Sequence, residues 1–259
     1  MTDKIPLKIH GTFDQPTVFH ITHYKSGSQW VAEILKWCAY RRAVLPEEHS
    51  RHFNRGQIVQ GLIYPTVYRS AQDFDQVLSA HKNLNWRAFG VIRDIRDTLI
   101  SLYFSVLKSH SDGFEDVRRD REVISSLSKE DGLIYLIMGD GQRPSYAERI
   151  AEIQSSWVKR DYPIFKYEDI LADELGSFRK ILNHCEIDFE EDYFNMVVNN
   201  NSFQSISGRE KGIEDSNSHF RKGISGDWKN HFTPKVIELI KQRYGELLIL
   251  TRYEERLDW

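Results

Sequence analysis

Residues 17–30 read Thr17-Val18-Phe19-His20-Ile21-Thr22-His23-Tyr24-Lys25-Ser26-Gly27-Ser28-Gln29-Trp30, and they point to one class of fold. The first six are rich in β-branched and aromatic side chains, which favour a strand. After a Lys-Ser-Gly turn, residues 30–38 carry apolar side chains at helical spacing. Free amides at the start of such a helix favour an anion, and Lys25 adds a positive charge. Taken alone, the turn is also compatible with an ordinary strand-to-helix connection.

The rest of the chain repeats this alternation. Hydrophobic patterns predict further strands over residues 62–68, 86–92 and 162–167, and helices over residues 71–81, 94–107, 145–160, 172–185 and 190–200 and from Pro234 onwards. Residues 110–131 are polar and are expected to form a surface excursion, whereas residues 207–230 read as a long loop that is either functional or disordered. The alternation predicts an α/β fold, in which a central parallel sheet is flanked by helices and residues 1–259 form a single domain.

Composition excludes several classes of function. The formal net charge is −3, so we do not expect a partner nucleic acid or insertion into an anionic membrane. No apolar run is long enough for a membrane span or a secretory signal, which indicates a cytoplasmic protein. Cys38 and Cys185 lie in apolar stretches and give no support for a disulfide. The histidines and cysteines have no zinc-ligand spacing, so no metal is expected.

Arg93 is a second candidate for anion binding, because it directly follows the strand predicted at residues 86–92. Ligands bind at the carboxyl ends of the strands in open α/β sheets. Ser101 comes about two helical turns later and can return to the same side. The alternative is a surface ladder of arginine and aspartate, which fits Arg96 and Asp97 better than Arg93.

Residues 220–232 form a third unusual segment, Phe220-Arg221-Lys222-Gly223-Ile224-Ser225-Gly226-Asp227-Trp228-Lys229-Asn230-His231-Phe232. Arg221 can grip a phosphate through two nitrogens, and Gly223 removes side-chain obstruction. A plain solvated loop seldom mixes glycines with three large aromatic side chains. The segment therefore predicts a loop that wraps around an anion.

Together these segments resemble the motifs of sulfotransferases that use 3′-phosphoadenosine 5′-phosphosulfate (PAPS). Residues 25–30 resemble the family's 5′-phosphosulfate loop, and Arg93 to Ser101 resembles its 3′-phosphate motif. Phe165-Lys166-Tyr167-Glu168-Asp169 is similar to the Tyr-Glu-Asp segment, and residues 221–229 are similar to the C-terminal Arg-Lys-Gly…Gly-Asp-Trp-Lys loop. The resemblance covers roughly residues 17–255. It implies a P-loop-NTPase-like three-layer fold and transfer of a sulfuryl group from PAPS to an acceptor hydroxyl or amine, without a metal.

The resemblance also implies roles for the first loop. Lys25 would contact the 5′-phosphate and the bridging oxygen, stabilising the charge that develops as the bond to the sulfuryl group breaks. Residues 26–29 would supply amides and hydroxyls to the 5′-phosphate. Trp30 would stack on adenine, opposite Phe203. Both aromatic residues could instead be plain core side chains.

For the 3′-phosphate, the resemblance implies contacts from Arg93, Ser101 and Arg221, while Tyr167 would lie against the nucleotide or simply cap a strand. The expected nucleotide-binding residues are Lys25, Ser26, Gly27, Ser28, Gln29, Trp30, Arg93, Ser101, Tyr167, Phe203, Arg221, Lys222 and Gly223.

The catalytic base is the main departure from the family pattern. Cytosolic animal members carry a catalytic histidine after the strand before the arginine strand, where this chain reads Val67-Tyr68-Arg69-Ser70. Other branches use a glutamate beyond the first helix, and Pro46-Glu47-Glu48-His49-Ser50 occupies that interval. We therefore expect Glu48 to act as the base, followed by Glu47 and His49, with His52 and Asp73 in reserve. A solvated turn is the alternative for this segment. Two smaller departures are His23-Tyr24, where the family has Tyr-Pro, and Gln29, where it has threonine.

Two other functions remain open at this point: a P-loop-type small-molecule kinase, which would need Mg²⁺ ligands, and a PAPS-binding homologue without activity. The sequence does not identify the acceptor, which could be a small molecule or a glycan. Acceptor contacts are expected from residues 46–61, 104–144 and 208–219. The oligomeric state is equally undetermined.

Overall fold

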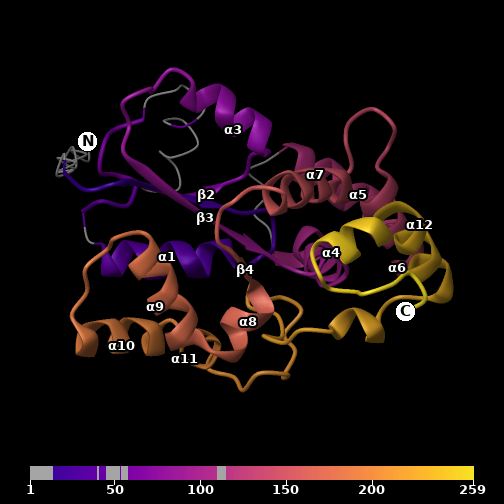
Figure 1. Ribbon diagram of the computed structural model, residues 1–259. Helices are drawn as coiled ribbons and strands as arrows, with labels where there is room; N and C mark the ends of the chain where they lie inside the picture. The colour runs from indigo at the N-terminus through magenta and orange to yellow at the C-terminus, as the bar shows by residue number, and fades with distance from the viewer. Residues whose placement is uncertain (1–13, 40, 45–52, 54–57, 110–114) are drawn as a thin grey trace, which may run out of the picture.

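The computed structural model describes residues 14–39, 41–44, 53, 58–109 and 115–259. In this part of the chain, parallel strands form one sheet in the order β2-β1-β3-β4 (Figure 1). β1 (Thr17–Ile21) lies between β2 (Ile63–Val67) and β3 (Trp86–Ile92), and β4 (Ile164–Lys166) pairs with the end of β3. Every residue of β1 and β2 is buried, which is why these strands read as continuous apolar runs.

Helices cover both faces of this sheet (Figure 1). On one face, α1 (Ser28–Cys38), α9 (Glu174–His184) and α10 (Glu191–Asn200) share a core with alternate residues of β1 and β3. On the other face, α3 (Ala71–Leu78) and α7 (Tyr146–Val158) bury large aromatic side chains against the sheet. The sequence-based prediction of a parallel sheet between two helical layers is therefore confirmed.

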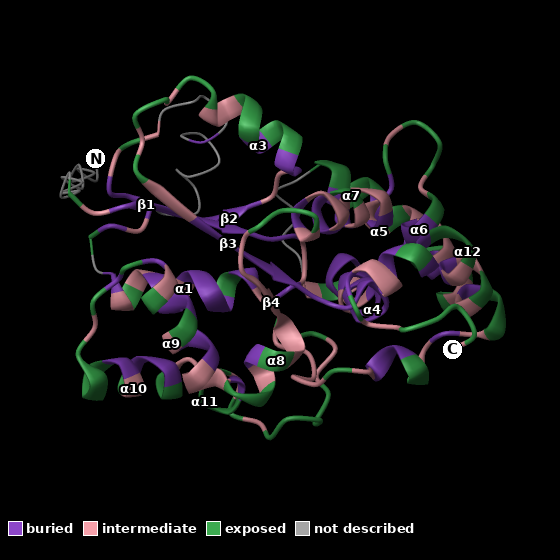
Figure 2. Cartoon of the chain, viewed as in Figure 1, coloured by how far each residue is buried: buried purple, intermediate pink, exposed green. Residues whose placement is uncertain are grey.

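A third core lies beside the end of the sheet that carries β4. It is built from α4 (Ile95–Phe104), α6 (Lys129–Met138), α12 (Pro234–Leu250) and the inner side of α7. A π-helical turn, Ser105–Ser109, extends α4. Figure 2 shows that the inner sides of these helices are buried while their outer sides are exposed. None of the helices in the described ranges combines the length and the apolar composition that a bilayer span requires.

The stretch 110–131, expected to be a surface excursion, contains a helix that the sequence did not predict. Residues 115–125 form α5 (Glu115–Ser125), which packs on α6 rather than standing out as a loop. Val117 and Ile124 are buried, and the carboxylate of Asp120 is fully buried. The helix is so rich in charge that its narrow apolar stripe is easily missed in sequence, because only one face of a surface helix needs to be apolar.

Two short helices near the sheet edge were also missed. α8 (Tyr167–Ala172) begins directly where β4 ends, and α11 (Phe203–Ser207) is a short helix capped by Ser202. Beyond α11, the long loop is held by Arg209, which donates hydrogen bonds to the carbonyls of Ile213, Phe220 and Arg221. A 3₁₀ turn at Asp227–Asn230 closes the loop. The loop therefore has a defined shape where it borders the site described next.

Candidate active site

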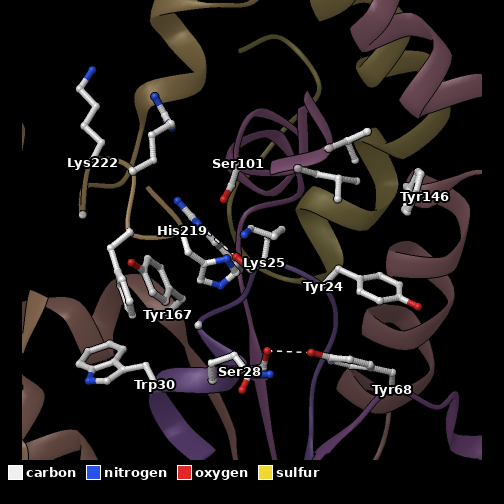
Figure 3. Close-up of a pocket in the computed structure, with 18 of the residues that line it drawn as sticks. Tyr24, Lys25, Ser28, Trp30, Tyr68, Ser101, Tyr146, Tyr167, His219 and Lys222 are labelled. Atoms are coloured by element: carbon white, nitrogen blue, oxygen red, sulfur yellow. Dashed lines mark hydrogen bonds between the residues drawn. The ribbon is translucent and has the colours of Figure 1, made fainter. Parts of the chain in front are cut away.

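A cavity of about 370 Å³ lies where the four strands end (Figure 3). The cavity is lined by residues that follow each strand. These are Tyr24 and Lys25 after β1, Tyr68 after β2, Arg93 after β3 and Tyr167 after β4. The carboxyl ends of parallel strands meet at one edge of a sheet, so this is the place where an α/β sheet binds ligands. The C-terminal loop closes the cavity with residues 219–224.

The first loop presents the start of α1 to this cavity. Gly27 is the N-cap of α1 with φ +82°, and no side chain caps this end of the helix. The Tyr167 ring lies so close that a Cβ on Gly27 would be 2.9 Å from it, so both the backbone angle and the space require glycine. The first amides of α1 thus remain available to an anion, as the sequence suggested.

The serines of this loop have different surroundings. Ser28 lines the cavity, as does the exposed Gln29. Ser26 does not: its hydroxyl is buried, donates to the carbonyl of His23 at 2.8 Å and pairs with the Thr22 hydroxyl. The structure therefore differs from the expectation of a hydroxyl contact from Ser26 to phosphate, because that hydroxyl is already used to shape the turn.

Lys25 lies between the two halves of the cavity, with Tyr24 and Tyr146 on one side and Trp30 and Tyr167 on the other (Figure 3). Its backbone is left-handed, with φ +63°, and its Nζ donates to the Ser105 hydroxyl at 3.3 Å. Burial, with a smaller contribution from the positive charge of Arg93, lowers the pKa of Lys25 to about 8. An anion bound beside Lys25 would therefore favour its charged form.

Arg93 connects three segments of the site. Its guanidinium donates to the carbonyl of Lys25 at 3.1 Å and of Ile224 at 3.4 Å, and it stacks 4.5 Å above the ring of Tyr167. Its Nε is buried and has no hydrogen-bond partner among the described residues. A buried cationic donor without a partner is costly, so this nitrogen fits an anionic ligand.

His23 explains one departure from the family pattern. Its side chain is fully buried and holds the end of β1 against β3. Nε2 accepts from the amide of Arg93 at 3.2 Å and lies 2.8 Å from the amide nitrogen of Gln154, while Nδ1 donates to the carbonyl of Tyr24. Burial lowers the pKa of His23 to about 4, so the ring is neutral at pH 7. His23 is a structural residue and does not line the cavity.

The residues expected at the 3′-phosphate all line the cavity, but they differ in the hydrogen bonds that their side chains already make. Ser101 lines it, and its hydroxyl has no hydrogen-bond partner in the described part of the chain. Arg221 also lines it, yet its two terminal nitrogens already bond Glu214 at 2.8 Å and Asp227 at 2.5 Å. A phosphate at Arg221 would therefore have to share the guanidinium with carboxylates or displace one of them.

Asp227 organises the cationic part of the C-terminal loop. It accepts hydrogen bonds from Lys222, Asn230 and Arg221. Burial by itself would raise the pKa of Asp227, but these bonds hold the pKa well below its ordinary value. Asp97 supports the same loop by accepting from the amides of Gly226 and Trp228. Lys222 therefore brings a positive charge to the cavity wall, but its ammonium is paired with Asp227.

Two further aromatic residues, Trp30 and Phe203, border the cavity. Trp30 packs on Phe178 and Tyr167 in the core, and it also lines the cavity. Phe203 lines the cavity from α11, and Gly223 lies directly against its ring. Both side chains are about nine-tenths buried. Each is therefore a core residue with one edge at the cavity, which fits a slot for a planar group.

Gly223→Ala should weaken the binding of adenosine 3′,5′-bisphosphate by about tenfold or more, because a Cβ there would lie 2.5 Å from the Phe203 ring and displace it. Gly226→Ala is the matched control. Gly226 has a left-handed backbone like Gly223, with φ +78° and +65° respectively, but nothing lies within 4 Å of the place that an added Cβ would occupy at Gly226. Both variants should lose about 1–2 kcal/mol of stability from the left-handed backbone. Calorimetry measures the affinities, and equal affinities would remove Phe203 from the nucleotide site.

The other half of the cavity was not anticipated in detail. Tyr24, Tyr68 and Tyr146 form an aromatic wall, with ring centroids 4.9 Å apart for Tyr24 and Tyr68 and 6.2 Å apart for Tyr24 and Tyr146. The Tyr68 hydroxyl pairs with Ser28 at 2.8 Å, and burial raises the pKa of Tyr68 to about 12. Sequence reasoning noted positions 24 and 68 as departures from a family pattern. That these two tyrosines line the cavity was not predicted.

The expected base cannot be placed. Glu47, Glu48, His49 and His52 lie outside the described residues. Asp73 is described, but it is exposed on α3 and does not line the cavity. Among the described residues that do, Asp116 is the only one with a carboxylate, and Arg143 lies 3.4 Å from it. In the same part of the chain, no group of three or more histidine, cysteine, aspartate or glutamate side chains could hold a metal ion.

Known proteins resemble this chain along most of its length. A family profile described as "Sulfotransferase domain" matches residues 15–252. Cytosolic sulfotransferase 3 of Arabidopsis thaliana is 25% identical over 231 residues, which cover 82% of this chain and 70% of that protein. Sulfotransferase 2A1 of Homo sapiens is 23% identical over 248 residues, which cover 88% of this chain and 83% of that protein.

Solved structures share the fold. The crystal structure of mouse sulfotransferase SULT7A1 complexed with PAP matches with a TM-score of 0.66 at 20% identity, covering 96% of this chain and 92% of that one. Retinol dehydratase, solved with androsterone and the inactive cofactor PAP, matches with a TM-score of 0.55 at 17% identity and coverages of 90% and 80%. Both likenesses confirm the three-layer arrangement.

Proposed function

The chain belongs to the sulfotransferase family, and we propose that it transfers the sulfuryl group of PAPS to a hydroxyl or amine of a small-molecule acceptor. One observation carries this proposal. In the described ranges of the chain, a helix N-terminus without a side-chain cap, the Lys25 ammonium and an Arg93 Nε without a hydrogen-bond partner converge on one cavity at the carboxyl edge of the sheet. These groups suit an anionic nucleotide, and family membership specifies which nucleotide is used.

The two halves of the cavity support separate roles. The half bordered by α1, Arg93, Ser101, Tyr167, Phe203 and the C-terminal loop would hold the nucleotide, because it gathers the cations and hydroxyls. The half bordered by Tyr24, Tyr68 and Tyr146 would hold the acceptor. We favour a small molecule over a glycan as the acceptor, because related proteins are named for steroid acceptors, such as 3-alpha-hydroxysteroid sulfotransferase of Cavia porcellus.

In the proposed reaction, PAPS supplies an activated sulfuryl group whose bond to the 5′-phosphate breaks as the acceptor oxygen or nitrogen bonds to sulfur. Lys25 stabilises the charge that gathers on the bridging oxygen, since it lies where the two halves of the cavity meet. A base removes the proton of the acceptor, and adenosine 3′,5′-bisphosphate is released. We keep Glu48 as the proposed base, with Glu47 and then His49 as the next choices.

Nucleotide binding tests this proposal directly. Adenosine 3′,5′-bisphosphate should raise the thermal midpoint, since a ligand present at a hundredfold excess over its Kd stabilises the native state by about 2.7 kcal/mol. AMP should bind more weakly, because it lacks the phosphate expected at Arg93 and Ser101. Equal affinity for the two nucleotides by calorimetry would contradict that assignment. Transfer from labelled PAPS should persist in excess EDTA; abolition with rescue by Mg²⁺ would favour the kinase instead.

A further inference from the structure

Two arginines border the acceptor half of the cavity, and their surroundings differ. Arg143 is neutralised: it bonds the buried Asp120, lies 3.4 Å from Asp116 and lies 3.8 Å from Asp140. Arg149 also lines the cavity, and it is half-buried. Its side chain has no hydrogen bond or ion pair in the described part of the chain. Among the described residues, the acceptor half therefore contains one guanidinium whose charge no carboxylate balances.

The position of Arg149 connects this charge to the aromatic wall. Arg149 and Tyr146 are three residues apart on α7, so they share one side of the helix. Tyr146 is fixed by its hydrogen bond to Asp120 at 2.8 Å, and its ring meets Tyr24 at 80°. Tyr68 is fixed by Ser28 at the other end of the wall. An acceptor lying along these rings would thus share one cavity with Lys25, beside the sulfuryl group, and with Arg149, one helical turn from Tyr146.

Within the part of the chain that the structure describes, the opposing charge in this half is Asp116. Its side chain is 63% exposed, and its carboxylate faces the guanidinium of Arg143. It therefore does not cancel the charge of Arg149. A guanidinium that is half-buried and unpaired binds a carboxylate through two parallel hydrogen bonds, which are stronger than bonds between neutral groups.

We propose that the acceptor is an aromatic compound that carries a carboxylate as well as the hydroxyl that is sulfated, and that Arg149 binds its carboxylate. This rests on the proposed function, since it assigns the acceptor of that reaction. The tyrosine wall contacts the ring of the acceptor through offset or edge-to-face packing. Arg149 thereby selects phenolic acids over neutral phenols of the same shape.

A matched pair of acceptors tests the proposal: 3-(4-hydroxyphenyl)propionate and its uncharged amide. The wild-type protein should sulfate the acid with a kcat/KM about tenfold to a hundredfold higher than the amide, the range for a hydrogen bond to a charged group. Arg149→Gln should reduce this ratio to about one by lowering kcat/KM for the acid only, and Arg149→Lys should restore part of it. Arg256→Gln is the control, because it removes the same charge from an exposed site away from the cavity.

The affinity for adenosine 3′,5′-bisphosphate is measured on every variant. It distinguishes a failure of the proposed acceptor from a failure of the proposed function. A ratio near one in the wild type, or a ratio unchanged by Arg149→Gln, would overturn the role of Arg149 while leaving sulfuryl transfer intact. Sulfation of neither phenol by a protein that binds the bisphosphate would overturn the phenolic-acid acceptor. Failure to bind the bisphosphate would instead contradict the proposed function itself.

Discussion

Lys25→Ala should lower kcat by about 10²–10³-fold while changing the affinity for adenosine 3′,5′-bisphosphate by less than about tenfold. The reason is that Lys25 is proposed to meet the bridging oxygen, whose negative charge grows only as the bond to the sulfuryl group breaks. Its position between the two halves of the cavity supports this role. Turnover is measured at saturating PAPS and acceptor, and affinity by calorimetry. An unchanged kcat would refute the role of Lys25.

Unfolding would not explain this loss. Burial lowers the pKa of Lys25 from 10.5 to about 8, so the charged side chain disfavours the native state below pH 8. Between pH 8 and 10.5 the native state releases this proton before the unfolded state does, and the contribution of Lys25 to stability rises with pH across that window. Lys25→Ala removes this cost, and its thermal midpoint at pH 7 should not fall.

The same pKa provides a second measurement on Lys25. Near pH 8 the wild type should take up about half a proton when the bisphosphate binds, because the anion restores the charged form. Calorimetry in buffers of different ionisation enthalpy measures this uptake. Lys25→Arg stays charged at that pH and should bind without it, while recovering only part of the lost kcat because its planar head reaches the bridging oxygen differently.

Replacing the proposed base should have an effect of similar or larger size. Glu48→Gln, or failing that Glu47→Gln, should lower kcat by about 10²–10⁴-fold on the true acceptor while nucleotide affinity stays unchanged. Both residues lie outside the described part of the chain, so the prediction depends on their place in the sequence. Turnover under saturating PAPS decides which glutamate acts.

Asp73→Asn is the control for these glutamates, since that carboxylate is exposed on α3 and away from the cavity. Its turnover should match that of the wild type. Near-normal kcat in both glutamate variants would exclude them and direct the search to His49. His23 would not be a candidate, because both of its ring nitrogens are hydrogen-bonded, it does not line the cavity, and burial lowers its pKa to about 4, which makes it a weak base.

The sequence could largely predict which residues line the proposed nucleotide half of the cavity, because these groups are local. Residues 25–30 form one turn and the start of one helix, so their spacing alone brings an ammonium and free amides together. Arg93 directly follows β3, and Ser101 lies on α4, the next helix of the chain. The sequence did not reveal that Ser26 turns its hydroxyl inward or that Arg221 is held by two carboxylates.

What the sequence by itself determined is the alternation of strands and helices and the candidate loops for anion binding at the strand ends, since both follow from short-range patterns of hydrophobicity and turn residues. Only the tertiary structure decided the acceptor half. Tyr24, Tyr68 and Arg149 come from three distant segments that meet because the sheet brings its strand ends to one edge. It also decided which arginine is neutralised. Residues 115–125, part of the stretch expected to be a surface excursion, form α5, which packs on α6 and brings Asp120 to Arg143. No carboxylate of the described residues pairs with Arg149.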